Sequence, residues 1–165
     1  MKLRIAGLAR ESVVDGPGIR FAVFTQGCRR NCPGCHNPTT HDPAGGELVD
    51  CATLAAEILR NPHLDGVTLT GGEPFLQAAA CAALLEPIRQ AGLHIIAYSG
   101  FTWEELCAQP DALPLLWQLD VLVDGPYRAD LRSPELPFRG SRNQRVINSP
   151  FRDVVQLSTN HSRKL

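Results

Sequence analysis

Short apolar runs that end in glycine or a turn alternate along the chain with longer segments rich in alanine and leucine. Four of these runs contain mainly β-branched, aromatic or other large apolar residues, which is typical of buried strands. They are RFAVFTQG (Arg20–Gly27), GVTLTGG (Gly66–Gly72), LHIIAYSG (Leu93–Gly100) and DVLVDG (Asp120–Gly125). A further short strand is expected at NQRVI (Asn143–Ile147).

Two helices are expected between the first three strands. Asp50 is suited to cap a helix that runs through about residue 60. A second helix should run from about residue 76 to 90, where Pro87 is expected to kink or shorten it and Gly92 to end it. Both segments connect one strand to the next, as helices do in βα units.

A third, shorter helix is expected at WEELCAQ, with Thr102 as its cap, Glu105 at the capping-box position and Pro110 at its end. Strand and connecting segment thus alternate four times, which predicts an α/β fold with a parallel sheet. Right-handed connections bring the carboxyl ends of parallel strands to one edge, where ligands bind. Every unusual motif of the chain follows a predicted strand, so one shared site is expected at that edge.

Charge is unevenly distributed. Residues 1–124 carry 8 basic and 14 acidic side chains, whereas residues 125–165 carry 8 and 3. We interpret the 165 residues as a single domain in which about residues 126–165 form a basic C-terminal extension. Arg139, Arg142 and Arg145 in this extension are candidates for docking a partner protein. Nucleic acid is not an expected partner, because the net charge is −1 and aromatic residues make up only 6%.

A cytoplasmic location is expected. No apolar run approaches the roughly 20 residues that span a bilayer, so no membrane partner is expected either. The N-terminal segment MKLRIAGLARE lacks the apolar stretch of a signal peptide. In such a compartment, six cysteines do not indicate a disulfide framework. Cys51, Cys81 and Cys107 lie apart in segments rich in Ala or Leu, and we expect them to be small buried residues.

The segment GCRRNCPGCHNP (Gly27–Pro38) holds Cys28, Cys32 and Cys35 in a Cys-x3-Cys-x2-Cys spacing. A structural zinc site needs four ligands, and His36 could be the fourth, although adjacent residues seldom both reach one tetrahedral ion. A 4Fe–4S cluster normally takes four cysteines, one for each iron. Three thiolates would leave one iron open to a substrate, as at a catalytic metal.

This loop resembles the signature of the radical S-adenosylmethionine enzymes. The resemblance implies a 4Fe–4S cluster held by Cys28, Cys32 and Cys35, with S-adenosylmethionine chelated at the fourth iron. Reductive cleavage would then give methionine and a 5′-deoxyadenosyl radical that abstracts a hydrogen atom. For a chain of this length, it also implies a truncated, open parallel (β/α) barrel of about four to six βα units.

Two further segments resemble cofactor-binding motifs of the same enzymes. TGGEP (Thr70–Pro74) is similar to their GGE motif, whose acidic residue meets the amino group of the cofactor. YSG (Tyr98–Gly100) lies where they place polar contacts to S-adenosylmethionine. The residues that the resemblance assigns to this cofactor are Gly34, His36, Gly71, Gly72, Glu73 and Ser99.

VDGPGIRF (Val14–Phe21), together with the cysteine loop, resembles the activases of glycyl-radical enzymes. The resemblance implies that Asp15 meets an incoming polypeptide substrate. YSGFTWEEL, DVLVDGPY and FRGSRNQRVIN resemble, within these activases, the anaerobic ribonucleoside-triphosphate reductase-activating proteins. Arg142 interrupts a more usual Gly-Ser-Ser-Asn run, and we assign it to the same contact with the partner.

The resemblance therefore implies an oxidoreductase that makes a glycyl radical on the large subunit of an anaerobic ribonucleoside-triphosphate reductase. Reduced flavodoxin or a similar protein would supply the electron, and no catalytic residue is expected beyond the cluster and its cofactor. Two alternatives remain. One is a radical S-adenosylmethionine enzyme acting on a small molecule, similar to 7-carboxy-7-deazaguanine synthase. The other is a metal-binding or electron-transfer module without enzymatic activity.

Overall fold

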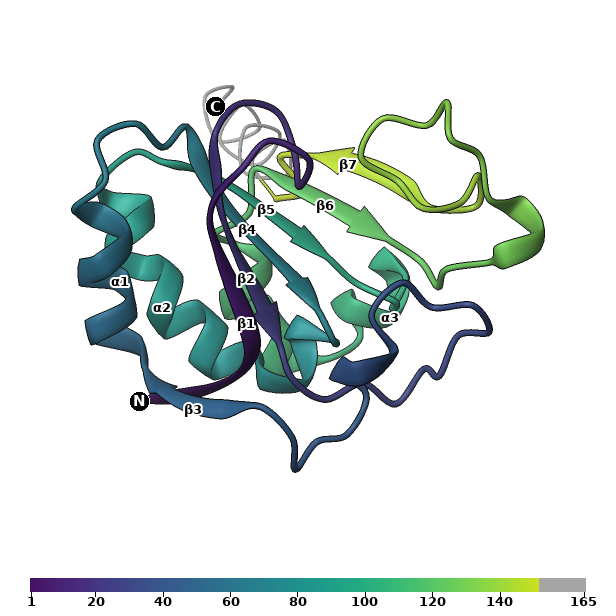
Figure 1. Ribbon diagram of the computed structural model, residues 1–165, viewed down its shortest axis with the longest axis horizontal. Helices are drawn as coiled ribbons and strands as arrows, with labels where there is room; N and C mark the ends of the chain where they lie inside the picture. Colours follow the sequence, from purple (N-terminus) through teal and green to yellow (C-terminus); the bar gives the residue numbers. More distant parts are fainter. Residues whose placement is uncertain (152–165) are drawn as a thin grey trace, which may run out of the picture.

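Seven strands form one mixed sheet in the computed structural model, which describes residues 1–151 (Figure 1). Their order across the sheet is β3-β1-β2-β4-β5-β6-β7. The strands are β1 (Lys2–Ser12), β2 (Arg20–Thr25), β3 (Glu47–Asp50), β4 (Gly66–Gly71), β5 (His94–Tyr98), β6 (Val121–Asp124) and β7 (Arg145–Asn148). The fold is therefore α/β with a sheet that is parallel at its centre.

The four central strands β2, β4, β5 and β6 are the ones that the apolar runs predict, and they are parallel to one another. Their register aligns Val23, Leu69, Ala97 and Leu122 in one row across the sheet. All four side chains are fully buried. Because side chains alternate between the two faces of a strand, this row defines the face that packs against the helices.

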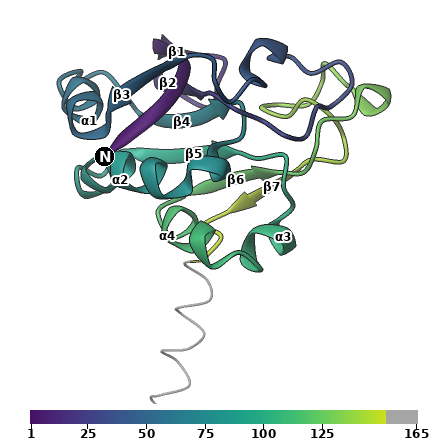
Figure 2. The same ribbon diagram turned by 90° about the horizontal axis from the view of Figure 1, so that it is seen from below.

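The helices are α1 (Cys51–Leu59), α2 (Ala78–Gln90), α3 (Trp103–Cys107) and α4 (Leu113–Leu116). α1, α2 and α4 bury Leu54, Leu84 and Leu115 in the same apolar core as that row. The three helices lie along one side of the sheet in Figure 2. Both helix caps that the sequence predicts are present. At the start of α1, the Asp50 carboxylate accepts the Thr53 N–H at 3.0 Å. Thr102 and Glu105 form the expected capping box of α3.

The edges of the sheet differ from the prediction of a purely parallel sheet. β1 and β3 add one antiparallel edge, and β7 adds the other by pairing with β6. The expected strand near β7 is confirmed, and the motif segments still lie at the carboxyl ends of the central strands. No helix among residues 1–151 is long and apolar enough to cross a membrane.

α2 ends at Gln90, as expected, with Pro87 inside it, and Gly92 follows in a left-handed conformation with φ of 82°. One local expectation is wrong. Cys107 is exposed at the end of α3, whereas Cys51 and Cys81 are buried as expected. A five-residue helix has one side toward the core, and in α3 the buried position belongs to the neighbouring Leu106.

The predicted basic extension is partly described. Its β7 belongs to the sheet, and Phe151 lies between two tryptophans, with ring centroids 4.4 Å from Trp117 and 5.0 Å from Trp103. Residues 152–165 of the extension lie outside the described part of the chain.

Candidate active site

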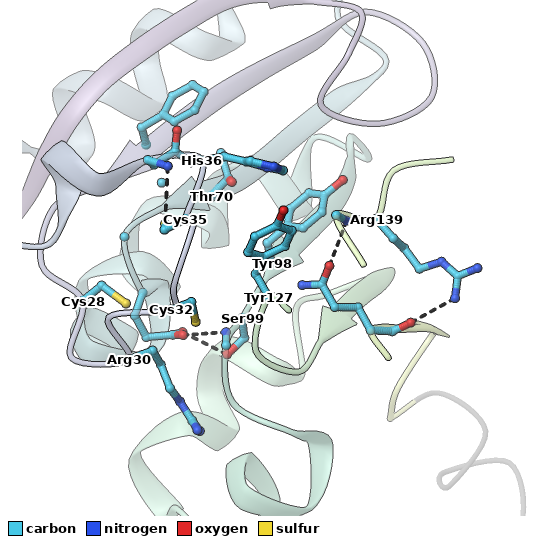
Figure 3. A pocket seen from close by; sticks show the side chains of 18 of the residues that line it. Cys28, Arg30, Cys32, Cys35, His36, Thr70, Tyr98, Ser99, Tyr127 and Arg139 are labelled. Atoms are coloured by element: carbon cyan, nitrogen blue, oxygen red, sulfur yellow. Dashed lines mark hydrogen bonds between the residues drawn. The ribbon is translucent and has the colours of Figure 1, made fainter. Parts of the chain in front are cut away.

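A pocket of about 470 Å³ lies at the carboxyl ends of the central strands, on the sheet face opposite the helices (Figure 3). Phe24, Thr70 and Tyr98 contribute side chains from that face. The predicted site residues that line the pocket are Asp15, Cys28, Cys32, Cys35, His36, Gly71, Gly72, Glu73 and Ser99. Gly34 and Arg142 are not among the lining residues. The structure thus brings together motifs that are up to 84 residues apart, from Asp15 to Ser99.

The cysteine loop is anchored at both ends by backbone hydrogen bonds. The Gly27 N–H donates to the Thr40 carbonyl at 2.7 Å, and the Cys28 N–H donates to the His41 carbonyl at 3.1 Å. Between these anchors, the Cys35 N–H donates to the Cys32 carbonyl in a tight turn. Gly34 has φ of 73° within this turn, a conformation that favours glycine. The backbone conformation of the loop is therefore enough to explain why residue 34 is a glycine.

The three loop cysteines are free and half-buried, and their thiols lie on the cysteine-loop side of the pocket in Figure 3. Burial raises the pKa of the Cys28 thiol above its ordinary value. Within residues 1–151, no three His, Cys, Asp or Glu side chains converge as ligands of a single ion. A 4Fe–4S cluster attaches each thiolate to a different iron, so its ligands need not converge on one point. The donor set fits such a cluster.

The Gly71–Gly72 pair packs against the end of β2. A side chain at Gly71 would start 2.7 Å from the Phe24 Cα, and one at Gly72 would start 2.5 Å from the Gly27 carbonyl oxygen. The Gly72 and Glu73 N–H groups donate to the carbonyls of Thr25 and Gly27, both at 2.8 Å. This part of the motif is thus fixed by contact with the chain itself, beside the first cysteine.

Glu73 is 1% exposed, and its carboxylate accepts three hydrogen bonds from the chain. The donors are the Phe75 N–H at 3.1 Å, the Ser99 hydroxyl at 2.9 Å and the Gly100 N–H at 2.8 Å. Burial raises the pKa of Glu73 to about 7, although these hydrogen bonds oppose the shift. Glu73 therefore ties the loop after β4 to the loop after β5.

Arg30 connects the cysteine loop to the start of α3. Its guanidinium lies 4.4 Å from the centre of the Phe101 ring and forms an ion pair with Glu105, with 2.6 Å between Nη2 and Oε2. The neighbouring Arg29 is exposed. Sequence reasoning missed the role of Arg30, since two consecutive arginines give no sign of which one turns inward.

The segment between β6 and β7 closes one side of the pocket with Tyr127, Phe138, Arg139 and Gln144. Gln144 organises it: its Oε1 accepts the Gly140 N–H at 2.8 Å, and its backbone carbonyl accepts a bond from Arg139 at 2.9 Å. Tyr127 contacts His36 of the cysteine loop, with 4.6 Å between the two ring centroids, and both residues line the pocket. Sequence reasoning assigned only Arg139, as a candidate for docking a partner, and none of the other three, although their segments carried the resemblance.

Arg145 is committed to contacts within the chain. It donates to the Asp124 carboxylate with both Nε and Nη2 and to Glu104 with Nη1 and Nη2. Asp124 is 1% exposed and also accepts the Trp103 N–H at 2.6 Å. The sequence suggested that Arg145 docks a partner, but in the structure its guanidinium is engaged by Asp124 and Glu104 within the chain, so Asp124 has a structural role. Arg142 is exposed, and 49% of the Arg145 side chain is exposed as well.

Comparison with known proteins supports the same interpretation. The 4Fe–4S single cluster domain family matches residues 14–147. The anaerobic ribonucleoside-triphosphate reductase-activating protein of Salmonella typhimurium is 35% identical in an alignment of 144 positions that covers 81% of this chain and 91% of that protein. The protein of the same name from Enterobacteria phage T4 is 32% identical, over 81% of this chain and 86% of that protein.

Two further proteins match a smaller part of their own length. The pyruvate formate-lyase-activating enzyme of Clostridium pasteurianum is 36% identical over 68% of this chain, and the chain spans about half, 51%, of that enzyme. The crystal structure of QueE from Escherichia coli superimposes with a TM-score of 0.48 and 18% identity, over 62% of this chain and 54% of that one. We draw no conclusion from a structural likeness at this level.

The chain therefore belongs to the 4Fe–4S single cluster domain family and, within it, to the radical S-adenosylmethionine activases of glycyl-radical enzymes, which are enzymes of the oxidoreductase type. The relatives that it covers nearly end to end carry the name anaerobic ribonucleoside-triphosphate reductase-activating protein.

Proposed function

We propose that the protein activates an anaerobic ribonucleoside-triphosphate reductase by generating a glycyl radical on its large subunit. The observation that carries the proposal is that three loop cysteines, the Gly71–Glu73 segment and Ser99 line one pocket. The names of the relatives of matching length supply the partner. The cytoplasm, where thiols stay reduced, is the proposed location.

Cys28, Cys32 and Cys35 would hold a 4Fe–4S cluster and leave its fourth iron to S-adenosylmethionine. When bound, the cluster supplies the electron that cleaves this cofactor into methionine and a 5′-deoxyadenosyl radical, which takes a hydrogen atom from the target glycine. Reduced flavodoxin or a similar donor protein would replace that electron. The thiolates, held by the anchored loop, fix the place at which the cofactor is cleaved.

Residues in and beside the pocket would bind and orient S-adenosylmethionine. We assign to this cofactor the lining residues His36, Gly71, Gly72, Glu73 and Ser99, together with Gly34, which lies in the cysteine loop outside the pocket lining. Glu73 has a carboxylate at the pocket wall, and a carboxylate suits the ammonium of the methionyl group. Its three hydrogen bonds within the chain hold it in one orientation, so it would meet the cofactor as a preformed partner.

We further propose that the central strands form a truncated, open parallel (β/α) barrel. An open side would admit a loop of a second protein, whereas an enzyme for small molecules usually closes over its substrate. Asp15 lines the pocket and would contact the incoming polypeptide. Arg142, exposed on the segment before β7, is assigned to the same partner at a distance from the pocket.

The test is activation of defined partners under anaerobic conditions. The reconstituted, reduced protein is incubated with S-adenosylmethionine and either the large subunit of an anaerobic ribonucleoside-triphosphate reductase or pyruvate formate-lyase. The glycyl radical is then counted by electron paramagnetic resonance. We expect a radical on the reductase and much less on the lyase. The assigned partner would be refuted by as much radical on the lyase as on the reductase, by radical on the lyase alone, or by no radical on either protein.

A further inference from the structure

The turn of residues 13–18 between β1 and β2 presents both apolar and acidic groups beside the pocket. Val14 and Asp15 line the pocket, and Val13 and Val14 are 71% and 77% exposed. The Asp15 carboxylate accepts the Ser12 hydroxyl at 2.5 Å. A turn that meets another protein must hold these groups in one orientation, because ordering a loop on binding costs affinity.

A relay of two hydrogen bonds holds this turn from below. Arg20 Nε donates to Thr68 Oγ1 at 2.6 Å, and the Thr68 hydroxyl donates to the Asp15 carbonyl at 2.8 Å. A hydroxyl has one proton, so Thr68 gives it to Asp15 and accepts from Arg20. Arg20 also reaches the Pro17 carbonyl at 3.3 Å. The relay and this additional bond therefore fix the carbonyls of Asp15 and Pro17 in the turn to Thr68 on β4 and Arg20 on β2.

The sheet is built around the Arg20 side chain, which is 1% exposed. Its Nη2 donates to the carbonyls of Val67 at 2.6 Å and His94 at 2.9 Å. Gly66, its neighbour on β4, provides space for the guanidinium, because a side chain at this position would start 2.7 Å from Nη1. Gly16 in the turn does the same, since a side chain would start 2.6 Å from Arg20 Cδ. The guanidinium thus has one place and one orientation.

Thr68 itself is fully buried and is not among the residues that line the pocket. It pairs with Ala22 and Ile96 in the register of the sheet, two residues before the Phe24–Thr70 pair along the strands and on the same face. Its hydroxyl can therefore influence the pocket through Asp15, whereas it makes no contact with a molecule bound among the loop cysteines. This separates its effect on a partner from any effect on cofactor cleavage.

We propose that Thr68 is a positioning residue which, backed by Arg20, sets the Asp15 turn for the polypeptide substrate and has no part in cleaving S-adenosylmethionine. The inference rests on the proposed function, because it assigns the turn to the partner protein. Loss of the Thr68 hydroxyl releases the Asp15 carbonyl and leaves the turn free to reorient. The partner then binds less well, while the cysteine loop and the Gly71–Glu73 segment are unchanged.

The experiment compares Thr68→Val, which keeps the shape of the side chain without its hydroxyl, with Thr68→Ser, which keeps the hydroxyl. Two quantities are measured on reconstituted protein: the KM and kcat for the reductase large subunit in glycyl-radical formation, and 5′-deoxyadenosine formation without the partner. Circular dichroism verifies folding. Thr68→Val removes both bonds of the relay, and we expect the loss of the neutral bond to the Asp15 carbonyl to raise the KM roughly fivefold. Thr68→Ser should restore the wild-type KM, and partner-free cleavage should be equal in all three proteins.

An unchanged KM in a folded Thr68→Val protein would overturn the inference, and so would an equal loss in partner-free cleavage. If Thr68→Val does not fold, Thr68→Ala is read against Thr68→Ser by the same criteria. A wild-type protein that places no radical on the reductase would instead refute the proposed function, which keeps the two failures distinct.

Discussion

Ser99 donates its hydroxyl proton to Glu73, with 2.9 Å between Oγ and Oε1. The resemblance assigns both residues to S-adenosylmethionine, and in the structure they also bind each other. Glu73 receives two backbone N–H groups as well, from Phe75 and Gly100. The pair therefore joins the loops after β4 and β5 before any ligand arrives, and the wall of the pocket is organised by the chain itself.

The burial of Glu73 predicts a dependence of stability on pH. Its pKa rises from 4.5 to about 7 on folding. Between these values the folded chain holds a proton that the unfolded chain releases, so the free energy of unfolding falls as the pH rises from about 4.5 to about 7. The expected loss from this group is on the order of 3 kcal/mol. Urea unfolding of the metal-free chain across this range measures it.

Glu73→Gln is the matched variant, because it removes the titrating group and keeps the shape. The difference in unfolding free energy between the wild type and Glu73→Gln should shift against the wild type as the pH rises through this window. Parallel curves for the two proteins would show that Glu73 titrates in the folded chain as it does in the unfolded one.

Arg30 is expected to hold the cysteine loop closed. Its stacking on Phe101 and its ion pair with Glu105 together contribute about 1 kcal/mol, which is roughly a fivefold change in the population of an open loop. Arg30→Ala should therefore lose cluster iron roughly fivefold faster in air, measured with an iron chelator. Arg29→Ala is the control, because Arg29 is exposed. Equal rates of iron loss in both variants would contradict this role.

Arg145 neutralises the buried Asp124, so its removal should destabilise the fold. Loss of one partner costs about 3–5 kcal/mol in a fully buried pair. Because the Arg145 side chain is 49% exposed, we expect about 2 kcal/mol for Arg145→Ala in urea unfolding. Adding Asp124→Asn should recover part of this loss, since no charge is then left unpaired.

Arg142→Ala is the control for that experiment, as it lies on the same segment and is exposed. It should change the free energy of unfolding by less than about 0.5 kcal/mol. If Arg145→Ala were as stable as Arg142→Ala, the Arg145 pair would have no structural role, and the docking role that the sequence suggested for Arg145 would be open again.

The central strands and the shared edge were predictable because they have local causes. The apolar runs at β2, β4, β5 and β6 cross a buried sheet, and parallel connections bring their ends together. The edge strands were not predictable in the same way. β3 has four residues, of which only Val49 is half-buried, so it carries no apolar pattern. The direction of β7 depends on the path of a segment with no such pattern.

The partners of charged side chains were the least predictable part of the site. Arg20 and Arg145 both look like surface residues in the sequence, and each is committed to an element far along the chain, Arg20 to Thr68 and Arg145 to Asp124. Such contacts depend on the register of non-adjacent segments, which one sequence does not encode locally. The cysteine motif, by contrast, is confined to eight consecutive residues, Cys28–Cys35, so it could be recognised from the local sequence alone.

The most direct test of the account is whether the loop cysteines support reductive cleavage of S-adenosylmethionine. The protein is reconstituted with iron and sulfide, reduced without oxygen and assayed for 5′-deoxyadenosine, beside Cys32→Ala and the exposed Cys107→Ala outside the loop. We predict product from the wild type and from Cys107→Ala and none from Cys32→Ala. A colourless wild-type protein that binds zinc and forms no 5′-deoxyadenosine would contradict the account.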